Sequence, residues 1–69
     1  MPGNVYKHIE LTGTSKNSIE EAAQTAIDEA AKTVRNMSWF EVLETRGAIK
    51  NGKLAEWQVT VRIGFKIES

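Results

Sequence analysis

A stacking surface and an amide are the groups of this chain best suited to hold a ligand. Trp39 is a large ring that serves either as a subunit-interface anchor or as a stacking surface for a flat molecule. Gln58 offers two amide donors and a carbonyl acceptor, which match the alternating donors and acceptors on the edge of a flavin or a nucleobase. Trp57 alternates in phase with Val59 and Val61, so we expect it to pack in a core or an interface.

The residue types argue against catalysis. The chain has no Cys, which excludes thiol nucleophiles, disulfides and thiolate-bound zinc. The one His, His8, has no recognisable partner for activating a serine, and one imidazole is too few for a His-rich metal site. Glu41, Glu44 and Glu56 could converge across an interface, but their spacing does not indicate an acid and base pair. We therefore expect a protein that is not an enzyme.

Length and charge restrict the remaining classes. The 69 residues allow one small domain, residues 1–69. Nine Lys and Arg balance nine Asp and Glu, so the long-range attraction toward nucleic acid or an anionic membrane is missing. No apolar run approaches the roughly 20 residues of a membrane span, and a cytoplasmic location is the default expectation. Because a core this small is usually completed by disulfides, metals or subunit contacts, we expect an oligomer.

The first half of the chain predicts a strand and a helix. Residues 5–14 alternate between apolar and polar side chains, which is typical of a strand with one covered face. Ser18 followed by Glu21 fits a capping box that begins a helix. Apolar residues then recur at steps of three and four as far as Val34, and Asn36 can close the helix. Most of this stripe is Ala, so the helix must lie close to the sheet that covers it.

The second half predicts a hairpin. Asn51-Gly52 supplies the positive backbone dihedrals of a two-residue type I′ turn. The odd positions of residues 55–67 are all apolar. The turn sets a register that pairs Phe40 with Ile63 on the core side and points Trp39 away from the helix. The element order is strand, helix, strand, strand, an α+β fold in which one antiparallel sheet curls around one helix.

The same register places the candidate site residues. Gln58 pairs with Thr45, six positions from Trp39, so the two side chains are about 20 Å apart. A small ligand held by both must therefore lie between two chains. Glu44 and Arg46 fall on the nominally apolar face, where we expect an ion pair, with a ligand contact by Arg46 as the alternative.

The lengths of the elements also indicate an oligomer. A helix of about nineteen residues spans about 28 Å, whereas strands of about fifteen residues span about 50 Å. The helix cannot cover the whole hairpin. We expect another copy to bury the uncovered end, near Trp57 and the turn.

With these residues in place, the sequence resembles the dodecin family over residues 6–68. The segments that carry the resemblance are Val34-Arg35-Asn36, Trp39-Phe40-Glu41-Val42, Thr45-Arg46-Gly47, Trp57-Gln58-Val59-Thr60-Val61 and Gly64-Phe65. The resemblance implies a three-stranded sheet around one helix, twelve copies in a hollow sphere, and flavin binding for storage or protection. It also implies that paired flavins such as riboflavin or FMN stack between two Trp39 rings. Gln58 would then hydrogen-bond the ring edge, with Arg46 and Thr45 as secondary contacts.

Two further expectations accompany the resemblance. Stacking an electron-rich indole on an isoalloxazine favours quenching of the excited flavin. Some members lack the stacking Trp and associate with metal ions instead, so a structural or ion-binding oligomer is the alternative function. Retention of Trp39 and Gln58 favours flavin. The sequence leaves open which flavin is preferred and whether coenzyme A is a second ligand.

Overall fold

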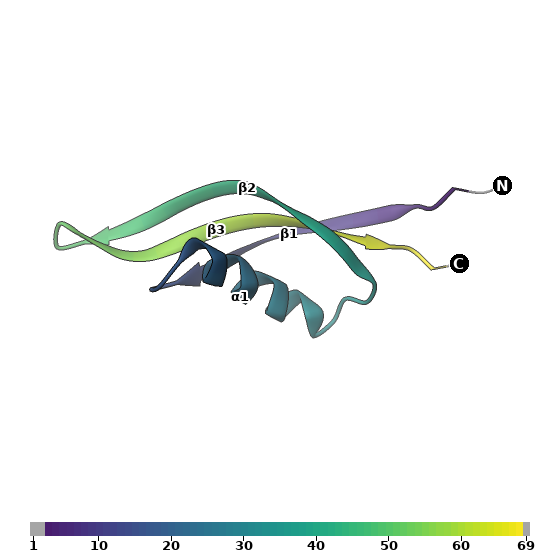
Figure 1. The fold of residues 1–69 in the computed structure, drawn as a ribbon, viewed down its shortest axis with the longest axis horizontal. Helices are drawn as coiled ribbons and strands as arrows, with labels where there is room; N and C mark the ends of the chain where they lie inside the picture. The colour runs from purple at the N-terminus through teal and green to yellow at the C-terminus, as the bar shows by residue number, and fades with distance from the viewer. Residues whose placement is uncertain (1–2, 69) are drawn as a thin grey trace.

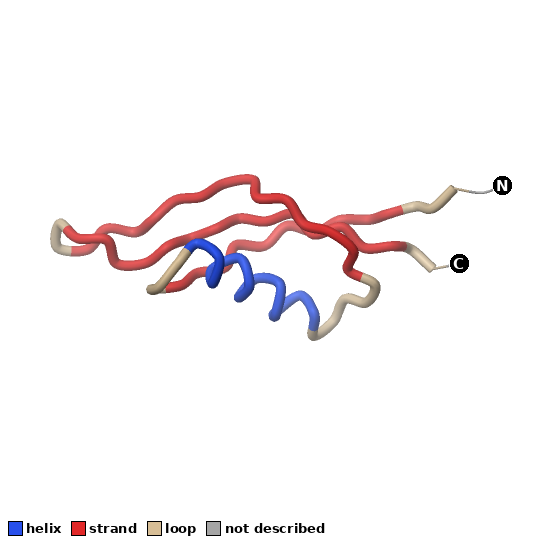
Figure 2. Tube along the Cα trace, in the orientation of Figure 1, coloured by secondary structure: helices blue, strands red, loops and turns tan. Residues whose placement is uncertain are grey.

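A computed structural model describes residues 3–68, which form three strands and one helix. The strands β1 (Tyr6–Ser15), β2 (Met37–Lys50) and β3 (Lys53–Lys66) build one antiparallel sheet in the order β1-β3-β2. The helix α1 (Ile19–Ala31) lies against one face of this sheet, as Figure 1 and Figure 2 show. The predicted α+β fold, with the first strand in the same sheet as the hairpin, is confirmed.

The core lies between β3 and α1. The alternation in β3 buries Val59, Val61 and Ile63, each at most 1% exposed. The helix presents the small side chains of its stripe to them, namely Ala22, Ala23, Ala26 and Ala30. The helix and the sheet approach closely at Gly13 of β1, where a Cβ atom would lie 2.1 Å from the Ala22 carbonyl oxygen. The small side chains of the helix and the glycine on the strand therefore let the two backbones pack closely, where larger side chains would hold them apart.

The helix begins as predicted, although the capping box is only half formed. The Ser18 hydroxyl accepts a 3.0 Å hydrogen bond from the Glu21 amide. The Glu21 carboxylate does not return to Ser18 but accepts from Ser15 Oγ at 2.5 Å and Asn17 Nδ2 at 2.7 Å. These bonds, that from Ser15 first, hold the pKa of the Glu21 carboxyl below its usual range. The carboxylate thus joins the end of β1 to the start of α1.

The helix ends earlier than predicted. Its last residue is Ala31, so Val34 and Asn36 lie in the connection to β2. The Val34 amide still bonds to the Ala30 carbonyl at 2.9 Å, but β-branched residues disfavour a further turn. Asn36 adopts the left-handed conformation, with φ of 63°, at the entry to β2 and not at the helix end.

The hairpin turn is confirmed, and it projects beyond the helix. Asn51 and Gly52 have φ of 55° and 75°, and Lys50 pairs with Lys53 as a type I′ turn requires. The molecule measures 57 Å along its longest axis, and the turn lies at the end farthest from both termini (Figure 1). Ile49 and Leu54 near the turn are 78% and 53% exposed.

The register departs from the prediction in the middle of the hairpin. Phe40 pairs with Ile63 and Val42 with Val61 as expected, but Leu43 has no partner and Glu44 pairs with Thr60. This bulge shifts residues 44–48 by one position until a second irregularity, between Ala48 and Ile49, restores the register. A one-residue shift exchanges the faces of the sheet.

This exchange of faces shows that three predicted placements on the sheet were wrong. Glu44 and Arg46 lie on the polar face and not on the apolar one, while Thr45 pairs with Val59 and lies on the helix side. Gln58 consequently pairs with Arg46, not with Thr45.

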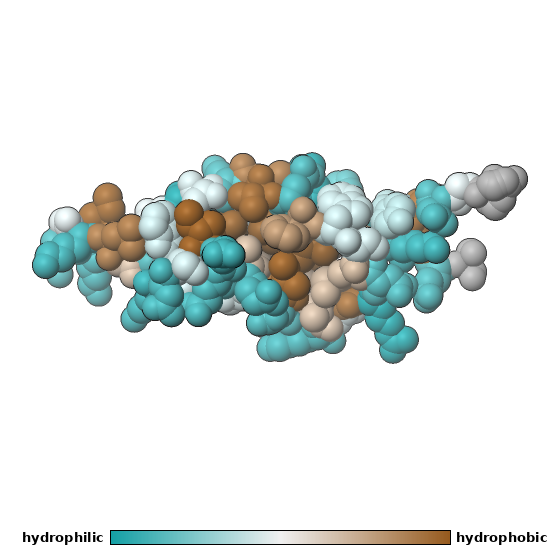
Figure 3. All heavy atoms as spheres, viewed as in Figure 1, coloured by the Kyte–Doolittle hydropathy of each residue, from teal (hydrophilic) through white to brown (hydrophobic). Residues whose placement is uncertain are grey.

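Part of the apolar face remains uncovered. Phe40 and Val42 point to the core side, yet they are 49% and 48% exposed because α1 contacts β1 and β3 more than β2. A groove between α1 and β2 is lined by these two residues with Ile19, Ala23 and Ile27. Figure 3 shows apolar surface along the middle of this side of the molecule.

Candidate functional site

The polar face of the sheet consists of rows of three residues that cross β2, β3 and β1. In an antiparallel sheet, directly opposed residues share a face, so the pairings define each row. From the termini toward the hairpin turn, the rows are Trp39-Gly64-His8, Glu41-Arg62-Glu10, Glu44-Thr60-Thr12 and Arg46-Gln58-Thr14. The face therefore has an aromatic end and a polar end, joined by charged residues.

The aromatic end is formed by Trp39 lying over Gly64. A Cβ atom built on Gly64 would come within 2.1 to 2.2 Å of Cε2 and Cζ2 of the Trp39 indole. Gly64 is buried, while Trp39 remains 43% exposed. One face of the indole is thus covered by the sheet backbone, and the exposed part is available to a flat partner.

The next row is an ion-pair cluster. Arg62 donates to Glu41 at 3.1 Å and to Glu10 at 3.3 Å, which joins all three strands. The Arg62 Nε atom is buried and has no hydrogen-bond partner within residues 3–68. Two carboxylates facing one guanidinium leave this row with a net negative charge.

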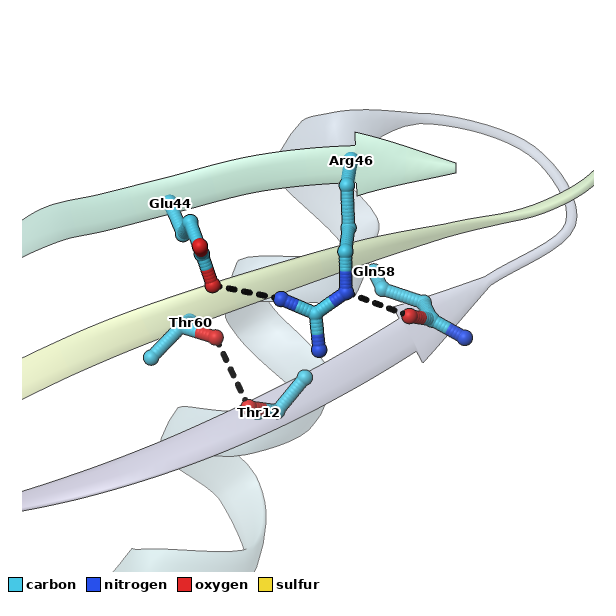
Figure 4. A network of polar contacts seen from close by, with 5 residues as sticks. All are labelled: Thr12, Glu44, Arg46, Gln58 and Thr60. Carbon is cyan, nitrogen blue, oxygen red and sulfur yellow. Dashed lines mark hydrogen bonds and ion pairs between the residues drawn. The ribbon is translucent and has the colours of Figure 1, made fainter. Parts of the chain in front are cut away.

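The polar end is a chain of hydrogen bonds that orients Gln58. Arg46 donates from Nε to Gln58 Oε1 at 2.8 Å and from an NH group to Glu44 at 2.5 Å (Figure 4). The Gln58 Nε2 group donates to Glu56 at 3.0 Å. Thr12 and Thr60 share a 2.8 Å hydrogen bond beside this network. The ion pair predicted between Glu44 and Arg46 is therefore present, although on the opposite face.

The two ends are far apart within one chain. Gln58 and Gly64 are six residues apart on β3, so Gln58 lies about 20 Å along the sheet from the row of Trp39. Of the residues expected at the site, Gln58 and Arg46 are brought together, Trp39 lies on the same face at a distance, and Thr45 lies on the other face.

Two residues of this face were missed by sequence reasoning. Gly64 was noted only as part of a family segment, although a glycine within an otherwise regular strand signals a close approach. Glu56 was considered as an acid or base, not as the partner of Gln58. Its position two residues from Gln58 on the same face was the available signal.

Two other kinds of site find no support in residues 3–68. In that range no three His, Asp or Glu side chains gather as ligands for a metal ion. The helix of the described segment is also too short and too polar to cross a lipid bilayer.

Comparisons with known proteins agree with the fold and with the resemblance in sequence. Residues 5–68 match the family described as Dodecin. A protein named Dodecin from Thermus thermophilus is 47% identical over 66 residues, which are 96% of each chain. The structure of dodecin from Streptomyces coelicolor superposes with a TM-score of 0.92 at 38% identity, covering 100% of this chain and 99% of that one.

A third relative differs in its name. Calcium dodecin from Mycobacterium tuberculosis is 30% identical over 93% of this chain and 90% of its own. Its crystal structure is described as having a novel calcium-binding site and superposes with a TM-score of 0.81, covering 93% of this chain and 91% of that one.

The fold and its polar face define a class of small β-α-β-β binding proteins whose sheet carries the candidate ligand residues. Within this class, the family match and the relatives that cover nearly the whole chain identify the family. The chain belongs to the dodecin family.

Proposed function

We propose that this protein is a homododecameric flavin buffer that holds riboflavin or FMN between the Trp39 rings of two copies. It acts by sequestering the flavin and quenching its excited state, and not by catalysis. The observation that carries the proposal is the Trp39 indole, which lies flat on the polar face and is 43% exposed. Core packing within the chain gives no reason for a large ring at this position.

The arrangement of the polar face supports a site made by two chains. Trp39 supplies a stacking surface about 20 Å from Gln58, which exceeds the reach of one small ligand. The Gln58 of one copy would therefore meet a flavin stacked on the Trp39 of another copy. Its Oε1 and Nε2 atoms are oriented by Arg46 and Glu56, so the amide is presented in one orientation.

Arg46 and Thr45 have different parts in this proposal. Arg46 lies on the ligand face, 48% exposed, and is available to the ring edge or to an attached phosphate. Thr45 pairs with Val59 on the helix side. Its expected secondary contact with the flavin would therefore come from the face opposite to that of Arg46 and Gln58.

The exposed apolar residues support assembly. Phe40 and Val42 line an open groove beside α1, and Ile49 and Leu54 project near the turn, all at least 48% exposed. Burying such side chains against other copies contributes roughly 1.5 to 3 kcal/mol per fully buried side chain. A chain of 69 residues without Cys has few other means of completing its core.

The second candidate is an ion-binding or purely structural oligomer. The similarity to calcium dodecin is the observation that favours it. Under that function, Trp39 is an interface anchor and its loss should prevent assembly. Under flavin binding, the assembly should form without Trp39 but bind flavin poorly.

The variant Trp39→Ala separates the two functions, with Trp57→Phe as the matched control. Riboflavin and FMN are titrated while flavin emission and particle mass are followed. We expect emission to be quenched by the native protein and the control. We expect Trp39→Ala to keep the native mass and to weaken binding at least about fivefold, because a stacked aromatic face contributes about 1 to 3 kcal/mol. Bright emission at saturation of the native protein would refute quenching, and failure of Trp39→Ala to assemble would favour the alternative.

A further inference from the structure

We propose that Gly64 is a positioning residue that sets the height of the Trp39 indole above the sheet, and thereby the thickness of the aromatic stack that fits between two copies. The proposal rests on the proposed function for its ligand, a planar tricyclic flavin. The position of the ring itself is argued from this chain alone.

The backbone gives no reason for a glycine at position 64. Of the glycines in residues 3–68, Gly52 alone has a positive φ, so residue 64 has a conformation that other residues can adopt. Glycine within a strand destabilises the fold relative to alanine, because its backbone loses more conformational freedom on folding. The neighbouring positions of β3 on the polar face all carry side chains, among them Gln58, Thr60 and Arg62. Some other requirement must therefore favour glycine here.

That requirement is the position of the Trp39 ring, which occupies the space where a side chain at residue 64 would lie. A Cβ atom would lie 2.1 Å from Cε2, 2.2 Å from Cζ2 and 2.7 Å from Cδ2 of Trp39. All three distances are below any real carbon contact, so even alanine would force the ring to lift or turn. Gly64 pairs with Trp39 on one side and with His8 on the other, which places it at the centre of its row.

Displacement of the Trp39 ring has a larger effect in a site that contains two Trp39 rings, one from each copy. If two Trp39 rings face each other across paired ligands, lifting each ring narrows the gap by twice the displacement. The gap must accommodate flat rings at van der Waals separation, so a shift of a few tenths of an ångström per ring changes which stack fits. Gly64 thus controls a dimension of the site without touching the ligand.

A second Trp and Gly pair in the same hairpin provides a matched control. Gly47 pairs with Trp57, and a Cβ atom on Gly47 would lie 3.3 Å from the Glu56 carbonyl oxygen and 3.9 Å from Trp57 Cε3. Gly47→Ala therefore adds the same methyl group to the same hairpin with little displacement of a ring.

The first test needs no ligand. A double-mutant cycle compares the thermal midpoints of the native protein, Gly64→Ala, Trp39→Ala and the double variant at one protein concentration. We expect Gly64→Ala to lower the midpoint when Trp39 is present. In the Trp39→Ala background it should leave the midpoint unchanged or raise it, because alanine restricts the unfolded chain. Equal shifts in the two backgrounds would overturn the proposal.

The second test measures the ring and the ligand. With Trp57→Phe in every protein, Trp39 is the remaining tryptophan and can be excited at wavelengths that Tyr6 does not absorb. Gly64→Ala should increase the quenching of Trp39 emission by acrylamide about twofold, whereas Gly47→Ala should not. FMN and riboflavin affinities should fall at least about tenfold for Gly64→Ala relative to Gly47→Ala. Unchanged acrylamide quenching, or native flavin affinity in Gly64→Ala, would overturn the proposal. If the native protein binds no flavin, the proposed function fails, and the ligand-free cycle and the acrylamide measurement still decide the role of Gly64.

Discussion

Arg46 and Gln58 are directly opposed across β2 and β3, and Arg46 Nε donates a 2.8 Å hydrogen bond to Gln58 Oε1. The pairing exists because Leu43 is an extra residue in β2, which moves Arg46 to the polar face. An arginine that a regular hairpin would place beside the core therefore orients the amide of the candidate ligand residue.

Arg46→Ala should weaken flavin binding more than it weakens the fold. Loss of the hydrogen bond lets the Gln58 amide rotate, and one such bond contributes about 0.5 to 1.5 kcal/mol, which is about two- to twelvefold in affinity. Because the pair with Glu44 is roughly half exposed, the free energy of unfolding should fall by less than about 1 kcal/mol. Flavin titration and urea unfolding measure the two effects, with Lys53→Ala at the hairpin turn as the control. A loss of stability above about 2 kcal/mol with unchanged affinity would show that Arg46 serves the fold instead.

Gly13→Ala should destabilise the chain strongly. Its Cβ atom would lie 2.1 Å from the Ala22 carbonyl oxygen and 2.7 Å from the Ala26 amide nitrogen, both of which belong to the helix backbone. Overpacking of this kind costs about 1 to 3 kcal/mol or more, because α1 must move away from β1. Urea unfolding of Gly13→Ala beside Gly47→Ala provides the measurement. Equal stability of the two variants would contradict the close packing of helix and strand.

Stability should fall at low pH through Glu21. Hydrogen bonds from Ser15 and Asn17 lower the pKa of this carboxyl in the folded chain. The stabilisation is therefore complete above the ordinary Glu pKa, about 4.3, and is lost as the pH falls through the lower folded value. Thermal midpoints from pH 7 to pH 2 should decline less over this window for Glu21→Gln, which cannot titrate, than for the native protein. Glu20→Gln, on the same first turn, is the control, and parallel curves for the native protein and Glu21→Gln would show that Glu21 contributes nothing.

Sequence patterns predicted the strands, the helix and their order, because each pattern reflects the conformation that a short segment prefers. Alternation in residues 55–67 predicted the last strand, β3, and Asn51-Gly52 predicted the turn and the pairing of Lys50 with Lys53. The prediction that Trp39 faces away from α1 is also correct, because the two irregularities in the hairpin cancel and the register counted from the turn holds again at Val42 and Trp39. These features depend on neighbours in the sequence.

The faces of residues 44–48 could not be predicted in the same way. Leu43 is as compatible with a regular strand as with a bulge, so nothing local marks the shift that exchanges Thr45 and Arg46. The helix end was also predicted too late, because the apolar spacing continues through Val34 after the helix has stopped at Ala31. Both errors arise where the path of the backbone depends on tertiary contacts.

Co-purification of flavin with the assembled protein tests the central claim most directly. The protein is purified from cells and passed over a size-exclusion column with light scattering, while absorbance is recorded for protein and for flavin. We expect a yellow peak near twelve times the 7.7 kDa chain, about 92 kDa, and one flavin per chain after saturation with FMN or riboflavin. A colourless monomer that takes up neither flavin would contradict the account.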